Sequence, residues 1–187
     1  TTILCPTASS DNSGLDVAWI ISGRVEGKRV PFAATEAEAL AIDPLPLSSE
    51  GDGRTRSNVT SVFDGKQTVF VWIETEAFGA RLEGLSFADG VGFPSSISYP
   101  VATTFTAKSA PRLASDGETG SLLVWAQGLS DGSSDVLGKF LPRDALRPTD
   151  TLAALRIATQ FERDEVNPSV AYSNDGESYF VAWGSRL

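Results

Sequence analysis

Four tryptophans constrain the fold of this chain more than any other feature of its sequence. They occupy one position of an internal repeat, at spacings of 53, 53 and 58 residues: Trp19, Trp72, Trp125 and Trp183. Each ends a similar phrase, which opens with Pro or Val, passes through a turn rich in Asp, Asn, Gly and Ser, and finishes in an apolar run. The opening residues are Pro6, Val59, Pro111 and Pro168. Self-similarity at a nearly fixed period is the signature of a repeat architecture.

Each phrase has the composition of a β-hairpin. Three turns contain an Asp-Gly pair, at residues 64–65, 116–117 and 175–176, and these residue types accept positive φ at low cost. The second strand, as in "TVFVWIE" and "SLLVWAQ", is apolar at consecutive positions rather than at alternate ones. We therefore expect this strand to be buried on both faces.

A third and a fourth strand follow each of the first three tryptophans. "RVEGKRV", "RLEGLSF" and "DVLGKFL" place a glycine between apolar residues, at Gly27, Gly84 and Gly138. Glycine inside a strand marks a bulge or a close approach of another segment. Short apolar segments come next, in "PLPLSS", "YPVATT" and "ALRIATQ", whereas residues 35–42, "TEAEALAI", form the one helical-looking stretch, in a connecting loop.

Four antiparallel strands in about fifty residues, repeated along the chain, are the signature of a β-propeller blade. The predicted fold is all-β, with propeller-like four-stranded antiparallel blades and about three and a half repeats. We expect a single repeat domain over residues 1–187, with repeats at about 5–57, 58–109, 110–166 and an incomplete 167–187.

The phrase P-x-V-A-x-(D/N)-G-x-x-(Y/F)-x-V-x-W, clearest at residues 168–183, resembles the repeats of secreted or cell-surface propeller-type proteins of bacteria. The resemblance implies an architecture and an extracellular, cell-surface or periplasmic location, but no particular activity. "SSDNSGLDVAW" and "ASDGETGSLLVW" also resemble the Asp-box of sialidases, S-x-D-x-G-x-x-x-W. We interpret this second similarity as convergent turn chemistry, because our predicted turn joins the first two strands of a blade, whereas the Asp-box joins the last two.

Charge and residue usage exclude several classes of function. The net charge of −9 argues against a nucleic-acid partner, and no apolar run reaches the roughly 20 residues of a membrane helix. The chain has no His, which removes Ser-His-Asp and Cys-His catalysis and every His-ligated metal site. Its single cysteine, Cys5, cannot form an internal disulfide.

One carboxylate pair has a spacing that fits catalysis. Glu74 and Glu76 alternate at the end of a predicted inner strand and so project to one face, as the acid and base of a glycosidase would. We favour a solvated strand end for this pair. The loops at residues 49–53 and 130–135 carry oxygen donors without the spacing of a calcium loop. The sequence therefore predicts no catalytic, cofactor-binding or metal-binding residue, and no cofactor.

From these features we predict a non-catalytic binding or structural module, a scaffold subunit that contacts other proteins and is not an enzyme. The first alternative is a lectin-like carbohydrate-binding domain, in which Phe78, Phe93 and Tyr99 are candidates for stacking on sugars. The second alternative is a fragment of a propeller glycoside hydrolase.

The incomplete fourth repeat predicts an open sheet edge at residues 179–184. We expect this edge to be covered by a protein partner or by the remainder of a longer chain, and we favour the longer chain.

Overall fold

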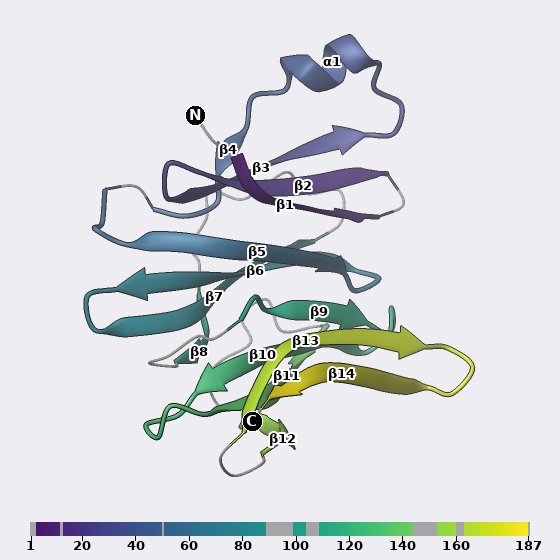
Figure 1. The fold of residues 1–187 in the computed structure, drawn as a ribbon. Coiled ribbons are helices and arrows are strands. Elements are labelled where there is room, and N and C mark those ends of the chain that lie inside the picture. Colours follow the sequence, from purple (N-terminus) through teal and green to yellow (C-terminus); the bar gives the residue numbers. More distant parts are fainter. Residues whose placement is uncertain are drawn as a thin grey trace.

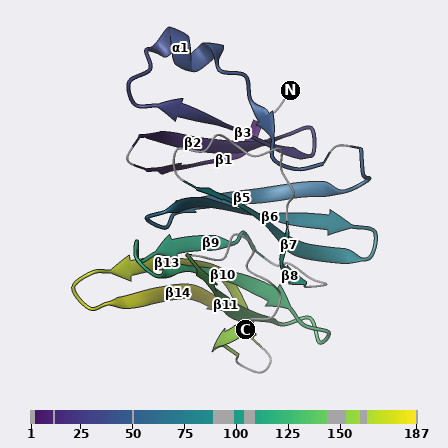
Figure 2. The same ribbon diagram turned by 180° about the vertical axis from the view of Figure 1, so that it is seen from behind.

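The structure is a computed structural model, which describes residues 3–11, 13–49, 51–88, 99–103, 109–143, 153–159 and 163–186. Its strands form antiparallel sheets that stack face to face, as both views show (Figures 1 and 2). The prediction of an all-β, propeller-like fold is confirmed. Two of the sheets have four strands and one has six. We call each four-stranded unit a blade, and we count the two-stranded hairpin at the end of the six-stranded sheet as a fourth, partial blade.

The blades follow one another along the chain. Blade 1 consists of β1 (Ile3–Ser10), β2 (Gly14–Ile21), β3 (Arg24–Pro31) and β4 (Leu45–Pro46). Blade 2 consists of β5 (Thr55–Phe63), β6 (Gln67–Glu76), β7 (Gly79–Ala88) and β8 (Tyr99–Thr103). Blade 3 consists of β9 (Arg112–Ser115), β10 (Gly120–Gly128), β11 (Ser134–Pro142) and β12 (Leu155–Ala158). A hairpin of β13 (Asp164–Ser173) and β14 (Ser178–Arg186) completes the series and joins β11 through one parallel bridge, Ser134 to Asp164.

The helical-looking stretch of the sequence is a short helix, α1 (Glu36–Ala41), between β3 and β4. Thr35 caps it: the Glu38 backbone N–H donates to the Thr35 hydroxyl, and the Thr35 backbone N–H donates to the Glu38 carboxylate. This capping box stabilises a helix that buries none of its residues and projects from blade 1 (Figure 1). Within the part of the chain that the structure describes, no helix has the length and apolarity needed to cross a bilayer.

Two apolar cores hold consecutive blades together. Ala18, Ile20, Val25 and Leu47 of blade 1 pack with Val59, Phe70, Trp72 and Leu85 of blade 2. A second core joins Val69, Val71, Ile73, Leu82 and Val101 of blade 2 to Leu123, Trp125 and Leu141 of blade 3. Trp72 and Trp125 therefore occupy successive blade interfaces, fully buried. Removing one indole from water contributes about 4–6 kcal/mol.

The consecutive apolar runs behave as the sequence predicts. β6 is buried over its first eight residues, and β10 is buried at all but one position, because each lies between two blades. The strand glycines mark close approaches: a Cβ at Gly27 would lie 2.8 Å from the Leu47 side chain, and one at Gly138 would lie 2.7 Å from Ile157. In blades 1 and 3 the fourth segment therefore packs directly over the glycine of the third strand.

The first strand of three blades contains a bulge at the same repeat position. The register of pairing shifts between Leu4 and Thr7, between Ser57 and Thr60, and between Val166 and Ser169. Two of these bulges hold an asparagine at positive φ, Asn58 at 55° and Asn167 at 52°, a conformation that Asn tolerates better than most residues.

The hairpin turns between first and second strands use aspartate carboxylates. Oδ1 of Asp64 accepts from the Lys66 and Gln67 backbone N–H groups, at 3.1 and 2.9 Å. The first two predicted turn glycines adopt positive φ, Gly65 at 91° and Gly117 at 75°. The prediction for Gly176 is wrong, because in the last turn the positive φ falls on Glu177. These turns join the first two strands of each blade, as the interpretation of the Asp-box similarity requires.

Candidate functional site

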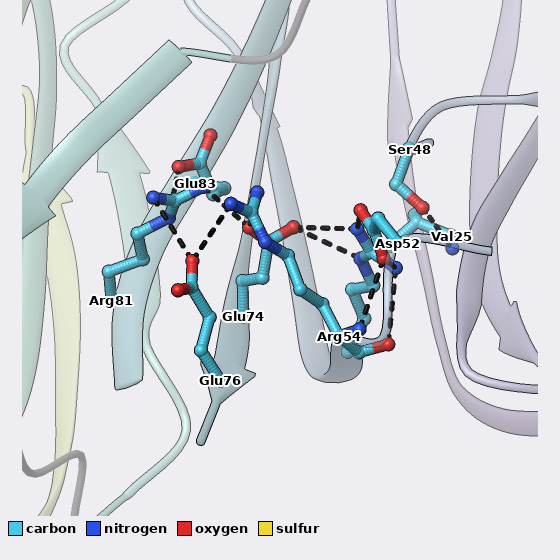
Figure 3. A network of polar contacts seen from close by, with 9 residues as sticks. Val25, Ser48, Asp52, Arg54, Glu74, Glu76, Arg81 and Glu83 are labelled. Atoms are coloured by element: carbon cyan, nitrogen blue, oxygen red, sulfur yellow. Dashed lines mark hydrogen bonds and ion pairs between the residues drawn. The ribbon is translucent and has the colours of Figure 1, made fainter. Parts of the chain in front are cut away.

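An ionic network lies at the end of blade 2 where β6 finishes and β5 and β7 begin (Figure 3). We call this end of the molecule, where β6, β10 and β14 all finish, the site end; it faces left in Figure 1. The network comprises Asp52, Arg54, Arg56, Glu74, Glu76, Arg81 and Glu83.

Glu74 is the centre of the network and is only 2% exposed. Its Oε1 accepts from Arg54 Nη1 at 2.8 Å and from Arg81 Nη2 at 2.7 Å, and its Oε2 accepts from Arg56 Nε at 3.0 Å. Three guanidinium groups therefore surround one buried carboxylate. The interpretation of this residue as part of a solvated strand end is wrong, because cross-strand pairing with Arg56 carries it inside.

Glu76 shares two of these arginines, with contacts of 3.0 Å to Arg54 and 3.2 Å to Arg81, but its side chain is 37% exposed. The sequence correctly places Glu74 and Glu76 on one face. What it misses is that Arg54 and Arg81 bridge the two carboxylates. Both carboxylates are therefore engaged by guanidinium groups.

Asp52 and Arg56 form the second half of the network. Asp52 lies on the β4–β5 loop, and hydrogen bonds from Arg56 lower the pKa of Asp52 to about 2. Burial alone would lower the pKa of Arg56, but hydrogen bonds and charges from Asp52 and Glu74 outweigh it and raise that pKa. Both partners are therefore charged at every physiological pH.

A pocket of about 380 Å³ opens beside the network, between the β2–β3 turn and the β4–β5 loop. Arg24, Asp52, Arg54 and Arg56 contribute to its lining. The Ser48 hydroxyl accepts from the Val25 backbone N–H at 3.0 Å and so fastens the loop to blade 1. The pocket therefore offers positively charged hydrogen-bond donors and a negatively charged acceptor to a polar ligand.

A second acidic group lies at the site end, where β13 begins. Glu165 is 1% exposed, and its Oε2 has no hydrogen-bond partner among the residues that the structure describes. Burial raises the pKa of Glu165, and the negative charge of Asp135 raises it further, while Arg163 partly offsets both. The Ser134 hydroxyl donates to the Glu165 backbone carbonyl at 2.9 Å and fixes the strand at this point.

Glu165 is a residue that the sequence reasoning missed. It stands two residues before Asn167, as Arg56 stands two residues before Asn58, so the two occupy equivalent repeat positions. The sequence does carry one sign of it: Glu165 is acidic at the repeat position where blade 2 has the basic Arg56, shortly before the phrase that begins at Pro168. The sequence places Asp135 at the end of a calcium-like loop and at the start of a predicted third strand, and neither position indicates a contact with Glu165. No group of three potential metal ligands occurs within the described parts of the chain.

The three predicted sugar-stacking aromatics have different outcomes. Phe78 is 91% exposed at the β6–β7 turn, on the site end. Tyr99 begins β8, but its side chain, like the whole of Phe93, lies outside the described residues.

No family model matches this chain, and no curated protein matches it. Solved structures do match. The α-L-arabinanase of Penicillium chrysogenum, in complex with arabinobiose, matches with a TM-score of 0.58 at 11% identity, over 96% of this chain and 58% of the arabinanase. The Bacillus subtilis arabinanase Arb43A matches with a TM-score of 0.51 at 13% identity, over 99% of this chain and 72% of that chain. A prolyl endopeptidase matches with a TM-score of 0.51 at 11% identity, over 95% of this chain and 24% of its own length.

The chain therefore spans little more than half of the first matched arabinanase and a quarter of the endopeptidase. At these identities the matches establish the propeller-like fold alone. Because all three matched structures are enzymes, the prediction of a non-catalytic scaffold that is not an enzyme is corrected, and the second alternative, a fragment of a propeller glycoside hydrolase, takes its place as the hypothesis to test. The scaffold prediction depended on the missing histidine and on interpreting Glu74 and Glu76 as a solvated strand end, although glycoside hydrolysis needs only two carboxyl groups.

Proposed function

We propose that this chain is part of a propeller glycoside hydrolase that acts on an arabinose polymer or a chemically similar polysaccharide. The observation that carries the proposal is Glu165, a buried carboxyl group at the site end of β13 with a raised pKa and with one oxygen that has no hydrogen-bond partner among the described residues. The arabinanase matches support the substrate class.

Glycoside hydrolysis pairs a protonated carboxylic acid with an ionised carboxylate. In our proposal Glu165 is the acid: it donates its proton to the glycosidic oxygen as the bond to the anomeric carbon breaks. Asp135 is the neighbouring negative charge that keeps this proton in place before the reaction. A second carboxylate accepts a proton from the attacking water, whose oxygen bonds to the anomeric carbon.

The ionic network has a positioning role in this proposal. By fixing the end of β6 and the start of β7, Glu74 and Arg81 hold the turn that presents Phe78 to solvent. An exposed aromatic ring offers an apolar face on which a sugar ring stacks. The pocket lined by Arg24 and Arg56 offers hydrogen bonds to sugar hydroxyls at the same end.

The test is sugar release from linear arabinan by the 187-residue chain, measured as new reducing ends. Glu165→Gln should reduce the rate about 10²-fold or more, the range for loss of a general acid. Glu36→Gln, on the exposed helix α1, is the matched control and should leave the rate unchanged.

A second substrate separates acid catalysis from a structural role. In an aryl arabinofuranoside made from a strongly acidic phenol, the phenolate leaves without being protonated. Glu165→Gln should therefore slow the hydrolysis of this substrate much less than that of arabinan. Equal losses on both substrates would refute the role of Glu165 as the acid.

A further inference from the structure

The pocket between the β2–β3 turn and the β4–β5 loop has an entirely polar lining. Its volume of about 380 Å³ lies within the range of small-molecule sites, roughly 300–1,000 Å³. The described residues that line it are serines, glycines, three arginines and one aspartate. A ligand of this pocket must therefore be polar, and its charge must suit the arginines.

The charges around the pocket are layered. The side chains of Arg24 and Arg54 are 38% and 34% exposed, whereas those of their acidic partners Glu26 and Glu74 are 8% and 2% exposed. Arg54 also contacts the more exposed Glu76. None of these three glutamates belongs to the lining of the pocket. A ligand that enters from solvent therefore meets the guanidinium groups before it meets the carboxylates that hold them.

Asp52, the one acid in the lining, is already engaged by an arginine. Its Oδ1 accepts from Arg56 Nη1 at 2.9 Å and from the Arg54 backbone N–H at 3.1 Å, and its Oδ2 accepts from Arg56 Nη2. Asp52 thus balances the charge of Arg56. The lining then carries two further positive charges, those of Arg24 and Arg54, without a further acid among the described residues.

The loops that form the pocket are fixed by their own contacts. The Ser48 hydroxyl holds the β4–β5 loop against Val25 of blade 1 (Figure 3). Gly23, Gly51 and Gly53 all adopt positive φ, and a Cβ at any of them would meet no atom within 4 Å. The glycines therefore turn the two loops and leave the space beside them open for a ligand.

We infer that this pocket binds the carboxylate of a uronic-acid unit in a polysaccharide. A planar guanidinium group matches the two oxygens of a carboxylate, and Arg24 and Arg54 both line the pocket. The Ser22 hydroxyl and the Asp52 carboxylate favour a sugar acid over a bare anion, because they can hydrogen-bond to ring hydroxyls. The inference rests on the proposed function for the class of polymer, and it adds that the polymer is acidic.

Trigalacturonate and its methyl ester provide a matched pair of probes, because they differ only in whether the carboxyl groups are charged. We would measure the binding of each to the 187-residue chain by isothermal titration calorimetry at low salt. Trigalacturonate should bind about tenfold or more tightly than the ester, the range for charge-assisted hydrogen bonds. Acetate and inorganic phosphate should bind more weakly than trigalacturonate.

Ser49 provides a matched pair of variants, because it lines the pocket and is exposed. Ser49→Glu adds a negative charge beside the arginines and should bring the ratio of the two affinities close to one. Ser49→Gln adds a side chain of the same size without the charge and should keep the preference for the acid. Near-UV circular dichroism of the buried tryptophans would show that both variants are folded.

Four results would overturn the inference. The first is equal affinity for the acid and the ester, and the second is no binding of either. The third is binding of acetate or phosphate as tight as that of trigalacturonate, which would show a general anion site. The fourth is an unchanged preference for the acid in Ser49→Glu, which would place the recognition elsewhere. These measurements involve no turnover, so failure to hydrolyse arabinan and failure to select the acid are separate outcomes.

Discussion

Replacing Glu74 by glutamine removes the carboxylate that three arginines share without changing the size of the side chain. Arg56, whose side chain is only 3% exposed, would keep a single acidic partner, Asp52. Breaking a buried ion pair from one side costs about 3–5 kcal/mol, because the remaining charge is left without compensation. Since Arg54 and Arg81 retain Glu76, we expect Glu74→Gln to fall at the lower end, about 3 kcal/mol.

Glu76→Gln is the matched control. It removes a carboxylate from the same strand and from two of the same arginines, but the side chain is 37% exposed. Exposed ion pairs contribute about 0–1 kcal/mol. With a urea slope of about 2 kcal/mol per molar, the unfolding midpoint should fall by about 1.5 M for Glu74→Gln and by less than about 0.5 M for Glu76→Gln.

The same unfolding curves at 1 M sodium chloride separate the two effects further. Salt screens exposed charges far more than buried ones. At 1 M sodium chloride the fall in the unfolding midpoint caused by Glu76→Gln should therefore vanish, while the fall caused by Glu74→Gln persists. Midpoints that fall equally in both variants would refute the reasoning, because they would show that Glu74 is as solvated as Glu76.

Three further predictions concern single residues. Gly65→Ala should destabilise the fold more than Gly117→Ala in urea unfolding, because both glycines have positive φ but only at Gly65 would a Cβ overlap another group, the Gly117 carbonyl. Burial alone would raise the pKa of Asp116, but hydrogen bonds from the Thr119 hydroxyl and from three backbone N–H groups lower it to about 2. The ionised Asp116 therefore contributes its full stabilisation above pH ~4, the pKa of an Asp in the unfolded chain, and this stabilisation is lost as the pH falls toward 2. Asp116→Asn should lower the urea midpoint at pH 7 and not at pH 2. A raised pKa makes the charged form of Glu165 unfavourable in the folded state, so Glu165→Gln should raise the midpoint at pH 7 and leave it unchanged at pH 3.

The repeat made most of the fold predictable. Trp72 and Trp125 lie between blades because an apolar run with no polar alternation has two faces to bury, and that pattern is visible in the sequence. The close approaches at Gly27 and Gly138 were also predictable, because glycine is unfavourable inside a strand unless another segment packs closely against it.

The site was less predictable because cross-strand register decides it. Periodicity places Glu74 and Glu76 on one face, but whether an arginine lies opposite depends on the bulge at Asn58, which shifts the pairing between Ser57 and Thr60. Sequence separation hides the partners too: Arg56 is eighteen residues before Glu74. The prediction of a positive φ at Gly176 was wrong for a local reason: Gly176 is the third of four turn residues, whereas Gly65 is the second.

The two buried indoles each connect one blade to the blade before it, and no apolar cluster in the described residues spans three blades. In such an arrangement each blade is stabilised only by its contacts with the adjacent blades, as in a linear array of repeats. Unfolding should then begin at the β13–β14 hairpin and move inward, so that the chain loses structure as a series of steps with blade 2, which has a core on each face, persisting longest.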